Sequence, residues 1–144
     1  MGAPELSPDG KWLAVVAGEY QKTSAVLVYP VAGGDSRELF RVNQPEALRA
    51  YGGIAWTPDS QHLVIVNDTL NTGTGRFFAK DLWLLSLNGD KPRKLEIDVK
   101  DWSGAIRLSA DGKRIAFFSG HDAREVWALE GVTATHGGKP VGRQ

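Results

Sequence analysis

One motif occurs three times along this chain, and no other feature restricts the fold as strongly. Each copy joins a short polar turn to a run of apolar residues, and the copies span Leu6–Val16, Trp56–Val66 and Leu108–Phe118. The aspartates at the centre of the turns are 50 and then 52 residues apart, at Asp9, Asp59 and Asp111. A period of this length is typical of stacked repeat architectures, in which neighbouring units cover each other's apolar faces.

A second block follows the first two copies of the motif. It consists of an apolar run, a glycine-containing turn and an Arg-Glu-Leu or Arg-Lys-Leu ending, and it spans Val26–Leu39 and Leu82–Leu95. Glycine, aspartate and asparagine at these turns favour tight hairpins between antiparallel strands. We therefore predict four antiparallel strands, A to D, in each full repeat. The third copy reaches Val126–Leu129 and then loses the pattern.

The strand that follows each motif turn separates two all-β architectures. Leu13–Val16, Leu63–Val66 and Ile115–Phe118 are apolar at every position. A strand of a two-layer sandwich shows one face to water and should alternate, so these strands must be covered on both faces. Buried strands of a parallel α/β sheet would need helical crossovers, and no helical periodicity of useful length separates them. Stacked four-stranded blades of a β-propeller meet the requirement.

The residues of the repeat also resemble a known family. The segment Ser7–Ala14, with the Arg-Glu-Leu and Arg-Lys-Leu endings, is similar to the TolB-type propeller repeat. That repeat also occurs in propellers of prolyl oligopeptidase-type enzymes and in extracytoplasmic sensor proteins. The resemblance covers about residues 4–130 and implies a β-propeller with an extracytoplasmic parent. Two departures weaken local turns: Ser60 replaces the turn glycine, and Ala110 replaces the proline.

The expected architecture is a single partial propeller domain. We place blade 1 at about residues 4–42, blade 2 at about 52–98, an incomplete blade 3 at about 104–130 and a tail at 131–144. Propellers typically close with four to eight blades. Three blades would leave two apolar faces uncovered, so the chain is expected to be half of a six-bladed ring or a fragment of a larger propeller. A homodimer or another closed oligomer is therefore expected, and the missing strand comes from the tail or from a partner chain.

The longer connections are expected at one end of the blades. In an antiparallel meander, the A-to-B and C-to-D turns lie at one end, and the B-to-C and D-to-A connections lie at the other. The second set holds all the long segments, at residues 18–24, 41–53, 67–81, 98–104 and 120–124. We call the end with these segments the loop rim and the opposite end the turn end. Loops on a rigid scaffold are where binding residues concentrate.

Aromatic and basic residues, which dominate protein-binding hot spots, are frequent in these segments. The candidate binding residues are Tyr20, Arg41, Arg49, Tyr51, Arg76, Phe77, Phe78, Lys80, Trp102, His121 and Asp122. Each also has a structural interpretation: Phe77 and Phe78 would pack in the core, Tyr51 would fill a blade junction, and the charges would simply be solvated. Residues 45–50 are compatible with one helical turn that begins at a proline.

No catalytic constellation is recognisable in the sequence. His62, His121 and His136 lack metal-ligand spacing, no nucleophile elbow occurs, and cysteine is absent. Ser119, His121 and Asp122 are too close in the chain to converge as a catalytic triad. Seventeen basic and seventeen acidic residues balance, which argues against nucleic acid as a partner. We expect no enzyme activity, metal or cofactor, no membrane insertion, and no export signal in Met1–Pro4.

Three functions follow as hypotheses. The first is a non-enzymatic propeller module that binds a protein or peptide at the loop rim, as the resemblance to TolB implies. The second is a structural or engineered half-propeller that self-assembles into a closed ring. The third is a propeller fragment of a peptidase or of a saccharide-active enzyme. The sequence does not identify the ligand or the cellular location.

Overall fold

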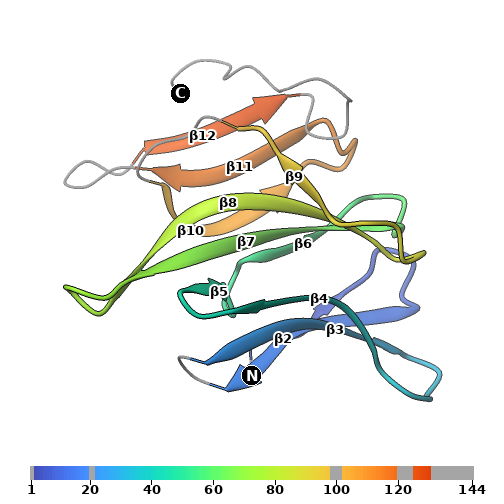
Figure 1. Cartoon of the computed structure of the whole chain (residues 1–144). Coiled ribbons are helices and arrows are strands. Elements are labelled where there is room, and N and C mark those ends of the chain that lie inside the picture. The colour runs from blue at the N-terminus through green and yellow to red at the C-terminus, as the bar shows by residue number, and fades with distance from the viewer. Residues whose placement is uncertain (1, 20–21, 98–101, 120–124, 131–144) are drawn as a thin grey trace.

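Three antiparallel sheets stack face to face in the computed structural model (Figure 1). The structure describes residues 2–19, 22–97, 102–119 and 125–130. Each sheet is one blade, and blade 2 lies between blades 1 and 3 (Figure 1). Among these described residues no α-helix occurs, so none is long and apolar enough to cross a membrane. The predicted all-β blade architecture is confirmed.

Blade 1 is a four-stranded meander in the order β1-β2-β3-β4. Its strands are β1 (Glu5–Leu6), β2 (Trp12–Glu19), β3 (Thr23–Pro30) and β4 (Arg37–Asn43). The β2–β3 hairpin pairs without a break from Trp12 opposite Pro30 to Glu19 opposite Thr23. Much of the connection expected at residues 18–24 is therefore strand.

Blade 2 has the same meander, but its first strand is divided in two. Its strands are β5 (Glu46–Leu48), β6 (Ile54–Trp56), β7 (His62–Asn71), β8 (Arg76–Ser86) and β9 (Arg93–Leu95). Both β5 and β6 pair with β7, and residues 49–53 bulge out between them. The prediction of a helical turn at residues 45–50 is wrong, because β7 extends far enough to pair with this segment. Long pairing of β7 with β8 likewise turns most of residues 67–81 into a projecting hairpin (Figure 1).

Blade 3 contributes three strands to the described part of the chain, in the order β10-β11-β12. They are β10 (Trp102–Leu108), β11 (Arg114–Ser119) and β12 (Glu125–Glu130). Trp102 begins β10 opposite Ser119, although the sequence suggested that it precedes the strand in a loop.

The apolar strands predicted from the repeat are covered as blade stacking requires. Leu63 and Ile65 of β7 belong to the core between blades 1 and 2. Val64 and Val66 belong to a second core, between blades 2 and 3. Alternate residues of one strand thus serve two different interfaces, which explains why the strand has no polar position.

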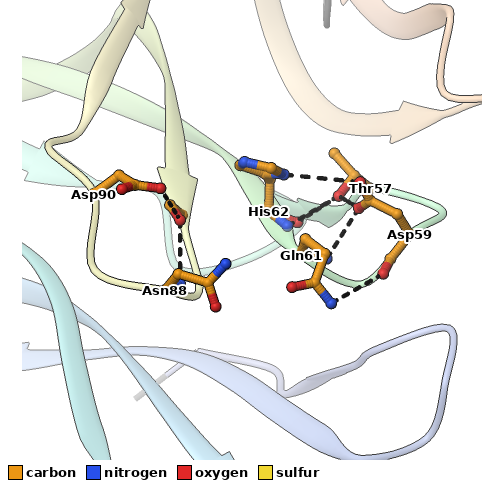
Figure 2. A network of polar contacts seen from close by, with 7 residues as sticks. Thr57, Asp59, Gln61, His62, Asn88 and Asp90 are labelled. Atoms are coloured by element: carbon orange, nitrogen blue, oxygen red, sulfur yellow. Dashed lines mark hydrogen bonds and ion pairs between the residues drawn. The ribbon is translucent and has the colours of Figure 1, made fainter.

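The motif turns share one hydrogen-bond pattern, shown for blade 2 in Figure 2. The Thr57 hydroxyl donates to Asp59 Oδ1 and accepts the His62 backbone N–H at 3.0 Å. The Asp59 carboxylate also accepts the Gln61 backbone N–H at 2.9 Å. These hydrogen bonds, first of all the one from Thr57, hold the pKa of Asp59 below its usual value.

The two other motif turns repeat this arrangement. Ser7 with Asp9 in blade 1, and Ser109 with Asp111 in blade 3, occupy the positions of Thr57 and Asp59. The pKa values of Asp9 and Asp111 are lowered in the same way, chiefly by the serine hydroxyl. The recurring aspartates are therefore turn residues, as their propensity predicted.

Ser60 shows how the second turn accommodates the loss of its glycine. It adopts a left-handed conformation, with φ at 59°, which is uncommon for a residue with a side chain. Its buried hydroxyl accepts the backbone N–H of Asp9 in blade 1 at 3.0 Å. The substitution therefore links the turns of two blades, an effect that the sequence analysis did not anticipate.

Candidate functional site

A cavity of about 360 Å³ opens between blades 1 and 2 at the loop rim. Its walls come from the end of β2, the start of β3, β5, the bulge at residues 49–53 and two side chains of the β7–β8 hairpin. This volume is within the range of small-ligand and side-chain pockets. The cavity therefore lies at the end of the blades where the long connections were expected.

Hydrogen bonds between blades fix the pocket walls. The backbone N–H of Leu48 in β5 donates to Ser24 Oγ in β3 at 2.8 Å, which holds blade 2 against blade 1. Val16, Ala17 and Ala47 supply apolar lining. The small alanine side chains leave the space that a larger residue would fill.

The bulge at residues 49–53 contacts all three blades. The backbone N–H of Ile106 in β10 donates to the Gly52 carbonyl at 2.8 Å. A Cβ atom on Gly52 would lie 2.5 Å from the Ala105 side chain, and a Cβ atom on Gly2 would lie 2.1 Å from the Ala50 carbonyl oxygen. Only glycine permits these approaches. The bulge is thus held on both sides, and it carries Arg49 and Tyr51 into the pocket lining.

An ion pair forms the polar part of the pocket. Arg49 Nη2 lies 2.7 Å from Asp68 Oδ1, and Arg49 Nε donates to Asp68 Oδ2 at 3.1 Å. The two side chains are only 17% and 9% exposed. Burial raises the pKa of Asp68, and the hydrogen bonds and charge of Arg49 oppose that rise. This two-point geometry fixes the orientation of both groups.

A second carboxylate lies beside this pair. Glu46 accepts hydrogen bonds from the Lys80 ammonium and, at 3.1 Å, from Asn67 Nδ2. The bond from Lys80 is the main cause of the lowered pKa of Glu46, and the same bond raises the pKa of Lys80. Asn67 is fully buried, and its Oδ1 has no hydrogen-bond partner within the described structure. The pocket therefore combines apolar walls with oriented charges.

The structure brings only some of the predicted binding residues together. Arg49, Tyr51 and Phe77 line the pocket, and Lys80 contacts it through Glu46. Tyr51 is 72% exposed, so it does not fill a blade junction.

The remaining predicted residues lie elsewhere or are not described. Arg41 lies on β4 and does not line the pocket, although it pairs with Glu38 and donates to the hydroxyl of Thr23, which does line it. Arg76 and Phe78 are exposed on β8 beyond the pocket. Trp102 is known only by its strand position. Tyr20, His121 and Asp122 lie outside the described residues.

Glu46 and Asp68 are the main residues that the sequence analysis missed. One signal was available for Asp68, because Asn67 and Asp68 continue the apolar run Leu63–Val66 without a turn residue between them. Polar residues that extend a buried strand require partners. Within the described part of the chain, no group of three or more histidines and carboxylates is arranged to hold a metal ion.

Comparisons with solved structures identify the fold. No protein-family model and no curated protein sequence matches the chain. Among solved structures, it is similar to a putative TolB from Agrobacterium tumefaciens, with 20% identity and a TM-score of 0.61 over 96% of this chain and 45% of that one. It is also similar to a puromycin-hydrolyzing peptidase of Mycobacterium tuberculosis, with 20% identity and a TM-score of 0.64 over 92% of this chain and 20% of that one.

A third similar structure is prolyl oligopeptidase B from Galerina marginata, with 19% identity and a TM-score of 0.60 over 97% of this chain and 21% of that one. The chain thus spans less than half the length of each of these proteins. The likeness confirms a propeller fold of the kind found in TolB and in prolyl oligopeptidases. At this identity it concerns the fold alone.

Proposed function

We propose that this chain is a propeller module that binds a peptide or protein segment at the loop rim, with a side chain of the partner in the pocket between blades 1 and 2. The observation that carries the proposal is the pocket itself, which has apolar walls around the oriented pair Arg49–Asp68. Concave sites with a few fixed polar groups are typical of ligand recognition. Two exposed aromatic residues at this end, Tyr51 and Phe78, offer further contact surface.

The pocket favours a neutral side chain of the partner over a charged one. Three carboxylates line it, on Glu19, Glu46 and Asp68, and two cations, on Lys22 and Arg49. Each carboxylate is already paired: Glu19 with Lys22, Asp68 with Arg49, and Glu46 with Lys80, which lies outside the lining. A charged group of the ligand would therefore lose its hydration without gaining an unpaired partner.

The test fills the pocket without touching its charges. Random peptides displayed on phage are selected against the chain, and one selected peptide is measured by fluorescence anisotropy. Ala17→Trp and Ala47→Trp should each weaken binding about tenfold or more, because both alanines line the cavity. Ala32→Trp, exposed at the turn end, is the matched control and should bind like the unchanged protein. Equal affinity of all four proteins would contradict the proposal.

A second candidate is the propeller segment of a longer peptidase. It is favoured by the likeness to two peptidases of which this chain spans about a fifth. The selected peptide also tests this candidate, by mass spectrometry after incubation with the chain. Cleavage that is lost in the His121→Ala variant would replace the binding proposal with a catalytic one.

A further inference from the structure

The outer faces of blades 1 and 3 carry the same repeat positions as the two faces of blade 2, and both faces of blade 2 are buried against its neighbours. Trp56, Leu63 and Ile65 are the residues with which blade 2 packs against blade 1. The repeat places Leu6, Leu13 and Val15 at the same positions of blade 1. They lie on the side of that blade that faces away from blade 2, because their neighbours Ala14 and Val16 face blade 2.

The outer face of blade 3 corresponds in the same way to the face of blade 2 that packs against blade 3. Val64 and Val66 are the residues with which blade 2 packs against blade 3, and Ala116 and Phe118 are their equivalents in the repeat. Since Ile115 and Phe117 face blade 2, these equivalents lie on the outer side of blade 3. Leu6 is 56% and Phe118 46% exposed, although both are large apolar side chains.

Within the three described blades these two faces cannot meet, because blade 2 separates them (Figure 1). We infer that they meet between two copies: blade 1 of each copy packs against blade 3 of the other, and the pair closes a six-bladed ring. A twofold axis generates both contacts at once. Six blades are within the range in which propellers close. The inference does not depend on the proposed function, since none of the five residues named on these faces lines the pocket.

The first test is the mass of the 144-residue chain in solution, by size-exclusion chromatography with light scattering over a dilution series. The inference predicts twice 15.6 kDa, with no larger species at high concentration. A folded monomer would overturn it and leave these faces to other blades of a longer protein. A mass that rises steadily with concentration would also overturn it, because contacts that do not close form open chains.

Three variants test which faces meet. Leu6→Glu and Phe118→Glu should each raise the dissociation constant at least about 100-fold, because each places a charge in both apolar contacts of the ring. Val31→Glu is the control, since Val31 is 51% exposed but lies in the turn between β3 and β4. Circular dichroism confirms that each variant is folded. If Leu6→Glu separates the copies and Phe118→Glu does not, two blade 1 faces meet and the ring is excluded.

An equimolar mixture of the two glutamate variants completes the test. One of the two contacts in a mixed pair would combine both substitutions, and the other would be unchanged. The mixture should therefore form pairs at concentrations at which each variant alone is monomeric. Failure to form mixed pairs would contradict the blade 1 to blade 3 contact.

Discussion

The two ends of the blades are built in different ways. At the turn end, an aspartate and the Ser or Thr two residues before it recur in every blade and make the same hydrogen bonds, as Ser7, Thr57 and Ser109 do. At the loop rim the described parts of blades 1 and 2 differ, and the junction between these two blades holds the buried pair Arg49–Asp68. The repeated end is therefore a structural device, and the unrepeated end carries the residues that distinguish this protein.

The largest effect on stability is expected from the ion pair Arg49–Asp68 at the loop rim. Arg49→Ala leaves the Asp68 carboxylate buried without its partner, which should lower the free energy of unfolding by about 3–5 kcal/mol. Arg41→Ala removes an arginine from an exposed pair with Glu38 and should cost less than about 1 kcal/mol. Urea unfolding measures both. Equal losses of unfolding free energy would show that Arg49–Asp68 stabilises the fold no more than an exposed ion pair does.

A smaller effect is expected from glycines at the two ends. Gly52 and Gly10 have nearly the same φ, +68° and +72°, but only Gly52 is crowded by another residue, Ala105. Gly52→Ala should cost about 2–4 kcal/mol, from left-handed strain and overpacking together. Gly10→Ala should cost about 1 kcal/mol from its backbone conformation alone. Similar losses in thermal unfolding would mean that the bulge at residues 49–53 is not held between blades.

The smallest expected effect is the pH dependence of stability, which has opposite signs for Asp59 at the turn end and Asp68 at the loop rim. The folded pKa of Asp59 is lowered from 3.8, so its contribution to stability is present above that value and is lost as the pH falls through the folded pKa. The folded pKa of Asp68 is raised from 3.8, so its contribution falls as the pH rises from 3.8 through the folded pKa.

Paired amide variants measure this difference. We compare the unfolding free energies of Asp59→Asn, Asp68→Asn and the unchanged protein between pH 3 and pH 7. Relative to the unchanged protein, Asp59→Asn should lose stability and Asp68→Asn should gain it as the pH rises. Differences of the same sign would contradict the opposite environments of the two carboxyl groups.

The same contrast explains what could be predicted from the sequence. Blade number, strand order and the role of the turn aspartates followed from local residues that recur, such as Asp9 and Gly10. The division of the first strand of blade 2 could not be predicted, because it depends on β7 being long enough to pair with both β5 and β6.

The pocket could be predicted only as a region. The sequence placed Arg49, Tyr51 and Phe77 at the loop rim, where the pocket lies, but did not separate them from Arg41 and Arg76. Their roles depend on contacts between blades, such as that of Leu48 with Ser24, which join residues 24 positions apart. Position along one strand carries no signal for such contacts. The link between Ser60 and Asp9 escaped prediction for the same reason.

The most direct test of the account is amide chemical-shift mapping by NMR with the selected peptide. We predict shifts at residues 16–19, 22–24 and 46–51, which surround the pocket, and none at the turns of Asp9, Asp59 and Asp111. Shifts that cluster at the turn end or on the outer faces of blades 1 and 3, with the pocket amides unmoved, would contradict the assignment of the binding site to the loop rim.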